Sequence, residues 1–309
     1  MINSEQKKRL EWLDIAKGMA IILMVLGHTS IPSSISNFIW AFHMPLFFIA
    51  SGFTTNWERY KVGYFAIHKA KTILLPFLIY SVILLLLSQA SSERVLLSDF
   101  LKQGWISWAL WFIPVLYCAT ILARLVFLVC NKYMRIIIVL AYLAVAGIFS
   151  YYKIQLPWSL STVPIAIVFV FVGIVLRKKS QIQSLSQKRV IILATMTFVI
   201  TTLISHYWRL DLCFNKILPL APLLISAITG TIMIFAISNL IERNSYHLSI
   251  LLKSIGRETF VIVAFSQIVI VLLNDYFALN ALIKYAILSI ILTSIVYAKN
   301  IIKQTLLKE

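Results

Sequence analysis

Apolar stretches long enough to cross a lipid bilayer follow one another along almost the whole of this chain. A helix of roughly 20 consecutive apolar residues spans the hydrocarbon core of a bilayer. By this criterion the sequence predicts ten spans, near 12–30, 36–56, 67–88, 107–128, 134–151, 159–176, 188–206, 216–240, 256–274 and 279–299.

The composition agrees with a membrane protein. Hydrophobic residues make up 61% of the 309 residues and charged residues only 13%, and the mean hydropathy is +0.91. Ordinary soluble domains are far more polar than this. We therefore predict an all-α integral membrane protein with about ten transmembrane helices in a single bundle. We expect one multi-pass domain over residues 1–309 and no separate soluble domain.

The formal net charge of +17 would suit a nucleic-acid partner, but the positions of the basic residues indicate a membrane topology instead. If the N-terminus is cytoplasmic, most of the 28 Lys and Arg residues fall on the cytoplasmic side, and the outer side keeps only Arg94, Lys102, Lys153, Arg209, Lys216 and Lys284. This is the positive-inside pattern of a protein with both termini in the cytoplasm. We expect a lipid bilayer as the environment and no nucleic acid as a partner.

The first two predicted spans carry ionisable residues where lipid would otherwise be. Asp14, Lys17 and His28 lie in the first span and His43 in the second. Such groups are costly inside a bilayer, so they usually face the protein interior and serve a function. Lys17 and His28 are eleven positions apart. That is about three helical turns, so the two side chains share one helix face about 16 Å apart along the axis.

His28 and His43 are predicted to lie at similar depth, because a short turn joins the first two spans. Two imidazoles that face each other could take up and return a proton near neutral pH. The alternatives are two interfacial or hydrogen-bonded histidines, or a His43 that only orients His28. We expect no metal site, because no Asp, Glu or Cys lies near them at ligand spacing and the three cysteines are widely scattered.

These motifs resemble membrane-bound acyltransferase family 3. Lys17, ten residues and then His28 match its Arg/Lys-x10-His signature, and LDIAKGMAIILMVLGH is similar to the first helix of the fucose 4-O-acetylase-like branch. Three later segments are also similar to family motifs: FHMPLFFIASGF with His43, Pro45 and Ser51, LWFIPVLY with Trp111, and IGRETFVIVAFSQ with Arg257 and Glu258. One position departs from the pattern. Gln267 stands about where the ninth helix commonly carries a histidine.

The resemblance implies an O-acetyltransferase that moves an acetyl group from cytoplasmic acetyl-CoA to a hydroxyl of a cell-surface polysaccharide or a lipid-linked glycan. His28 would act as general base or carry the acyl group, and His43 would orient it or relay a proton. Acetyl-CoA is expected as a donor substrate, with no permanently bound cofactor. The expected location is the bacterial inner (cytoplasmic) membrane.

Four cations at inner helix ends are candidates to hold the phosphates of CoA: Lys17, Lys69, Lys71 and Arg257. The alternative for Lys69 and Lys71 is ordinary positive-inside flanking, and the alternative for Arg257 is an ion pair with Glu258. Four further residues are expected to support the site: Asp14, Ser51, Trp111 and Glu258. Asp14 would pair with Lys17, and Trp111 would either stack on a sugar or serve as a packing aromatic.

Two other functions fit the same residues. A proton-coupled transporter or flippase for a glycan or small anion would use the histidines as a proton relay. A scaffold or sensor subunit would use neither histidine catalytically. A cationic group at one membrane face coupled to a histidine pair at the other favours the enzyme, because a transporter does not need a site for the phosphates of CoA.

Overall fold

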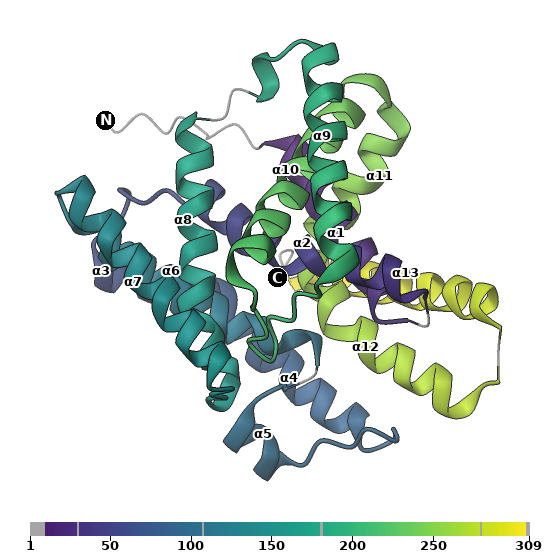
Figure 1. Ribbon diagram of the computed structural model, residues 1–309. Coiled ribbons are helices and arrows are strands. Elements are labelled where there is room, and N and C mark those ends of the chain that lie inside the picture. Colours follow the sequence, from purple (N-terminus) through teal and green to yellow (C-terminus); the bar gives the residue numbers. More distant parts are fainter. Residues whose placement is uncertain (1–9, 30, 107, 180–181, 279, 307–309) are drawn as a thin grey trace.

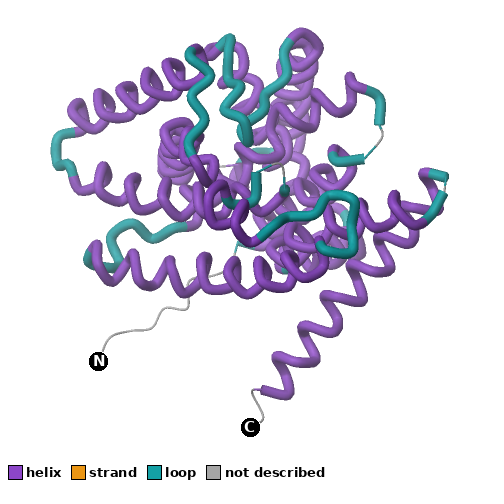
Figure 2. The backbone as a smooth tube through the Cα atoms, turned by 90° about the horizontal axis from the view of Figure 1, so that it is seen from below, coloured by secondary structure: helices purple, strands orange, loops and turns teal. Residues whose placement is uncertain are grey.

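The computed structural model describes residues 10–29, 31–106, 108–179, 182–278 and 280–306. Within these ranges the protein is built of helices, and the one β-type pairing is an isolated bridge between Asp211 and Lys216 (Figure 1, Figure 2). The α-helices are α1 (Glu11–Gly27), α2 (Ser33–Thr54), α3 (Val62–Lys69), α4 (Leu75–Ser88), α5 (Leu97–Gln103), α6 (Phe112–Leu128), α7 (Lys132–Tyr151), α8 (Val163–Lys179), α9 (Gln187–Tyr207), α10 (Leu220–Asn244), α11 (Tyr246–Arg257), α12 (Thr259–Tyr276) and α13 (Ala281–Leu306).

The predicted membrane-spanning bundle is confirmed. Nine helical segments of the described residues are long and apolar enough to cross a membrane: Ser33–Thr54, Val62–Ser88, Ala109–Leu128, Lys132–Tyr151, Pro157–Lys178, Gln187–Tyr207, Leu220–Asn244, Thr259–Tyr276 and Ile283–Ile301. The first predicted span corresponds to α1, which has 17 residues. The chain ends that the sequence places in the cytoplasm, residues 1–9 and 307–309, lie outside the described residues.

Short irregular turns extend several spans. A π-helical turn, Ala70–Leu74, joins α3 to α4 just before Pro76. Because proline has no N–H for the carbonyl four residues earlier, a wider turn at this point accommodates it without ending the helix. Two 3₁₀ turns, Ala109–Trp111 and Pro157–Thr162, lead into α6 and α8.

Most of the expected inner loop between the spans 216–240 and 256–274 is helical instead. Residues 246–257 were expected to be mostly inner loop, but they form the separate helix α11, and the spanning helix α12 begins only at Thr259. At 12 residues α11 is too short to cross a bilayer. It packs one face, with Ser249, Leu252 and Gly256, against the bundle and leaves Tyr246 and Leu251 exposed.

The centre of the bundle consists of α1, α2, α8 and α10, and α2 packs against the other three. Glycines allow the closest approaches. A methyl group on Gly52 of α2 would overlap the carbonyl oxygen of Val170, and one on Gly173 of α8 would overlap that of Ile49. Small residues permit such backbone contact between membrane helices, where lipid supplies little hydrophobic driving force for association. These two glycines therefore set the spacing between α2 and α8.

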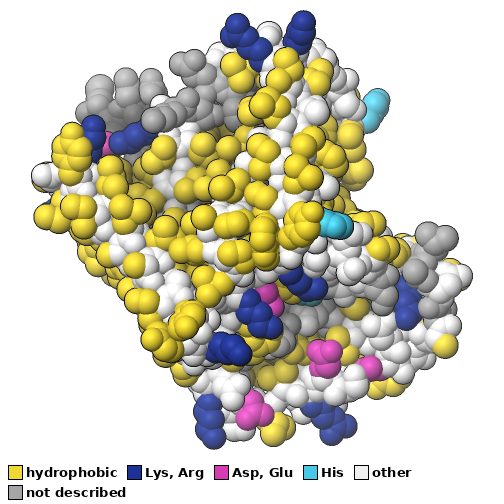
Figure 3. All heavy atoms as spheres, in the orientation of Figure 1, with side chains coloured by type: hydrophobic (Ala, Val, Ile, Leu, Met, Phe, Trp, Pro, Cys, Tyr) yellow, Lys and Arg dark blue, Asp and Glu magenta, His cyan; other side chains and the backbone are white. Residues whose placement is uncertain are grey.

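The outer helices present apolar side chains to the surroundings. Ile136, Ile137 and Leu140 of α7 and Met196 and Leu203 of α9 are exposed. Figure 3 shows hydrophobic side chains covering a broad area of one face of the molecule. Such a surface is suited to lipid, because a soluble monomer rarely exposes so large an apolar area.

We expect Gly173→Ala to lower the free energy of unfolding by about 1–3 kcal/mol, because the added methyl group forces α8 away from the backbone of α2. Thermal unfolding in detergent measures the effect. Gly63→Ala is the matched control, since Gly63 lies in α3 with nothing within 4 Å of the added methyl group. Equal destabilisation by the two substitutions would show that close packing of α2 and α8 is not required.

Candidate active site

The turn between α1 and α2 brings His28 and His43 to one cavity. His28 caps the C-terminus of α1, and its backbone N–H donates to the carbonyl of Met24 at 3.2 Å. His43 lies on α2 and is only 3% exposed. The indole of Trp40 contacts both imidazoles, with its ring centroid 5.6 Å from that of His28 and 5.6 Å from that of His43. As predicted, the two histidines lie close together, on one cavity.

Hydrogen bonds distinguish the two imidazoles. The Nδ1 atom of His43 lies 3.0 Å from the carbonyl oxygen of Ile39. Because a carbonyl only accepts, Nδ1 carries the proton in the neutral ring, and Nε2 is the nitrogen with the lone pair. The ring of His28 makes no hydrogen bond with any described residue. His43 is therefore oriented by its own helix, whereas both ring nitrogens of His28 can meet a substrate.

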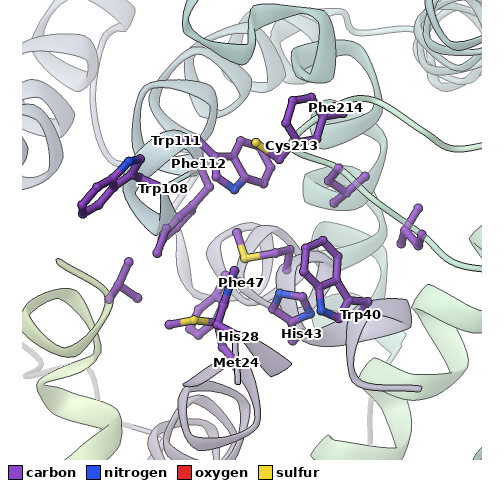
Figure 4. Close-up of a pocket in the computed structure, with 15 residues that line it drawn as sticks. Met24, His28, Trp40, His43, Phe47, Trp108, Trp111, Phe112, Cys213 and Phe214 are labelled. Atoms are coloured by element: carbon purple, nitrogen blue, oxygen red, sulfur yellow. The ribbon is translucent and has the colours of Figure 1, made fainter. Parts of the chain in front are cut away.

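The cavity beside the histidines has a volume of about 210 Å³. In Figure 4, His28, His43 and Trp40 lie along one side and the aromatic rings of Trp111 and Phe112 lie across from them. Its lining residues are Met24, His28, Trp40, His43, Met44, Phe47, Trp108, Ala109, Trp111, Phe112, Leu210, Leu212, Cys213, Phe214 and Val263. Small-molecule sites commonly have roughly 300–1,000 Å³. This cavity is therefore large enough for one small chemical group beside the histidines, and most of the side chains around that group would be apolar.

Residues distant in sequence hold this wall in place. Trp40 donates from Nε1 to the carbonyl of Gly27 at 3.3 Å, which ties α2 to the end of α1. Gln267 of α12 accepts at Oε1 from the backbone N–H of Ala109 at 2.7 Å. Gln267 thus fixes the 3₁₀ turn that carries Trp111 into the cavity.

A charged cluster lies toward the other end of α1. The Asp14 carboxylate is 3.4 Å from the Nζ atom of Lys17 and 3.8 Å from the Nε atom of Arg257. The Asp14 side chain is 4% exposed, while those of Lys17 and Arg257 are 27% and 48% exposed. The expected pairing of Asp14 with Lys17 is confirmed. The alternative partner for Arg257 is wrong, since Arg257 pairs with Asp14 and Glu258 pairs with Lys299.

Lys69 lies in a different group of cations. Its Nζ atom donates to the hydroxyl of Thr55 at 3.1 Å, and Arg177 donates to the carbonyl of the same Thr55 at 2.7 Å. Arg124, which is buried, donates to the nearby Tyr60 carbonyl at 3.0 Å. The four predicted phosphate-binding residues are thus divided: Lys17 and Arg257 are together, Lys69 is beside Arg177, and Lys71 is exposed in the π-helical turn.

Of the residues expected to support the site, Trp111 lies at the cavity and Ser51 does not. Trp111 lines the cavity. Ser51 is half-buried in α2 and is not among the residues that line it. Sequence reasoning missed Trp40 and the roles of Arg177 and Arg124. A buried arginine inside a predicted span is a signal that could have drawn attention to Arg124.

Comparison with known proteins identifies the family. A family model described as an acyltransferase domain matches residues 10–299, which is nearly the whole chain. The chain belongs to acyltransferase family 3. The comparisons with curated proteins and with solved structures gave no match. The resemblance inferred from the motifs is confirmed at the level of the family, and the fucose 4-O-acetylase-like branch stays a prediction. With its spanning helices, this family 3 protein is a membrane acyltransferase.

We expect Asp14→Asn to lower the free energy of unfolding of this acyltransferase by about 1–3 kcal/mol, because it removes the buried carboxylate between Lys17 and Arg257. Thermal unfolding in detergent measures the loss. Glu11→Gln is the control: it breaks the Glu11–Lys253 pair, in which Glu11 is 50% exposed, and should cost less than about 1 kcal/mol. A cost for Asp14→Asn no larger than that of the control would contradict a structural role for the cluster.

Proposed function

We propose that this family 3 acyltransferase is an O-acetyltransferase. It moves an acetyl group from cytoplasmic acetyl-CoA to a hydroxyl of a cell-surface polysaccharide or a lipid-linked glycan, in the inner membrane of a bacterium. The observation that carries the proposal is the arrangement along α1. This one helix has the histidine cavity at its C-terminal end and the Lys17–Asp14–Arg257 cluster near its N-terminal end.

The separation of the two ends suits a donor and an acceptor that arrive from opposite sides. Lys17 and His28 are about 16 Å apart along the helix axis. In CoA a pantetheine arm separates the thioester from the phosphates, so phosphates at one end of α1 leave the thioester free to extend toward the other end. The net basic charge on the predicted cytoplasmic face supports binding of an anionic donor there.

The cations near the start of α1 are the first candidates for the phosphates. Arg257 is partly exposed beside Lys17, and its planar guanidinium can contact a phosphate through two N–H groups. Lys69 and Arg177 form a second set of donors around Thr55, at the C-terminal end of α2. Lys71 follows two residues later in the chain, at the surface.

His28 is proposed to act on the acceptor hydroxyl. As general base it takes the hydroxyl proton while the oxygen attacks the thioester carbonyl carbon; the carbon–sulfur bond then breaks and the CoA thiolate leaves. If His28 instead carries the acyl group, its nitrogen attacks the thioester carbonyl carbon, the carbon–sulfur bond breaks and CoA leaves with the imidazole proton. The acceptor hydroxyl then attacks the acyl-imidazole, the carbon–nitrogen bond breaks and the hydroxyl proton returns to the imidazole. The ring nitrogens of His28 make no hydrogen bond with the described residues, which supports either role for His28. His43, held by Ile39, positions Trp40 and His28.

The apolar wall supports transfer rather than hydrolysis. Trp108, Trp111 and Phe112 surround the space in which an acetyl group would meet the histidines. Exclusion of bulk water keeps an activated acyl group from reacting with water before the acceptor hydroxyl arrives.

We expect His28→Ala to reduce acetyl transfer at least about a hundredfold, because it removes the group that takes the hydroxyl proton or carries the acyl group. The measurement is incorporation of radiolabelled acetyl from acetyl-CoA into glycan by membranes that contain the variant. His206→Ala, an exposed histidine at the end of α9, is the control and should retain activity. Wild-type rates in the His28 variant would end its catalytic assignment.

A further inference from the structure

The loop between α9 and α10 forms one wall of the histidine cavity. Its two arms are joined by backbone hydrogen bonds between Asp211 and Lys216, at 3.1 Å and 2.7 Å. Thr162 donates to the carbonyl of Leu212 at 2.6 Å, which anchors the loop to the turn before α8. Leu210, Leu212, Cys213 and Phe214 line the cavity. The loop is therefore a built part of the site.

This loop carries two cations on rings that line the cavity. The guanidinium carbon of Arg209 lies 4.1 Å from the ring centroid of Trp40. The ammonium nitrogen of Lys216 lies 5.5 Å from the ring centroid of Phe214. Both cations are exposed, whereas the two rings are half-buried. Arg209 and Lys216 therefore lie just outside the lining of the cavity, each against one of its rings, on the side predicted to face outward.

Neither cation is neutralised by a carboxylate of the described residues. Among the residues that the structure describes, none makes an ion pair or a hydrogen bond with the charged group of Arg209 or of Lys216. The carboxylate of the same loop, Asp211, accepts at Oδ1 from the backbone N–H of Phe214 at 3.4 Å. A cation–π contact leaves the N–H groups of a guanidinium available for an oxyanion. Trp40, on which Arg209 stacks, has its ring centroid 5.6 Å from those of both His28 and His43.

We propose that the acceptor of this enzyme is anionic, and that Arg209 with Lys216 holds its carboxylate or phosphate beside the cavity while the hydroxyl reaches His28. This inference rests on the proposed function, because it takes the histidine cavity to be the acceptor site. The shared chemistry is an oxyanion, supplied either by the sugar as a uronate or by a phosphate that links the sugar to a lipid. A neutral sugar would leave the two cations unmatched.

Equilibrium binding tests the inference without requiring transfer. The full-length protein in phosphatidylcholine nanodiscs is titrated with methyl β-glucuronide, with undecaprenyl-phosphate-linked glucose and with neutral methyl β-glucoside, by isothermal titration calorimetry. We expect at least one anionic probe to bind about tenfold more tightly than the glucoside, as expected for a charge-assisted hydrogen bond. The probe that is preferred identifies the source of the oxyanion.

In the double variant Arg209→Gln/Lys216→Gln, the dissociation constant of the glucoside should be about equal to that of the preferred anionic probe. Arg209→Lys should retain part of the preference, because the charge remains. Arg94→Gln, at an exposed arginine elsewhere on the predicted outer side, should keep the wild-type ratio.

Several results would overturn the inference. These are equal binding of anionic and neutral probes by the wild type, an unchanged ratio in the double variant, or an equal loss of all binding in a folded double variant, which indicates a structural role for the stacked cations. Disappearance of the preference in phosphatidylglycerol nanodiscs would show that lipid headgroups occupy the two cations. The acetyl-CoA assay with His28→Ala is independent, so an anion preference without any acetyl transfer would contradict the proposed function alone.

Discussion

Direct backbone contact between α1 and α11 determines where the charged residues of this protein lie. A methyl group on Gly18 would overlap the carbonyl oxygen of Leu252, and one on Gly256 would overlap that of Asp14. Only glycine at both positions lets the two backbones meet. Because Arg257 follows Gly256 directly, this contact places its guanidinium against the Asp14 carboxylate. The cationic end of α1 therefore results from packing as well as from sequence.

Asp14 and His43 are buried in the bundle, and each has a specific partner, as an apolar environment favours. Asp14 has two cations beside it, and His43 has the carbonyl of Ile39. His28 differs, since it lies at a helix end, faces a cavity and makes no hydrogen bond through its ring with the described residues. A titratable ring held ready for a substrate is what acid–base catalysis needs. This contrast is why we propose His28 as the reacting group and His43 as the residue that orients it.

Much of the fold was predictable from sequence because membrane insertion imposes a strong local signal. Every predicted span corresponds to a helix, and the spacing of Lys17, His28 and His43 was enough to bring the two histidines to one cavity and to indicate the family. Helix α11 was not predicted because it is amphipathic and too short for a hydropathy window. Contacts between segments distant in sequence were also missed. Neither the meeting of Lys69 and Arg177 at Thr55 nor the stacking of Arg209 on Trp40 leaves any periodic pattern in the chain.

We propose that α1 connects a donor site at one membrane face with an acceptor site at the other. Sided labelling tests it most directly. Cysteine is introduced as Arg257→Cys or as Arg209→Cys in a protein whose Cys118, Cys130 and Cys213 are replaced by serine, and each variant is treated with a membrane-impermeant maleimide in intact cells and in inverted vesicles. We expect position 209 to be labelled only from outside and position 257 only from the cytoplasmic side, and we expect CoA to protect position 257 alone. Labelling of both positions from the same side would contradict it.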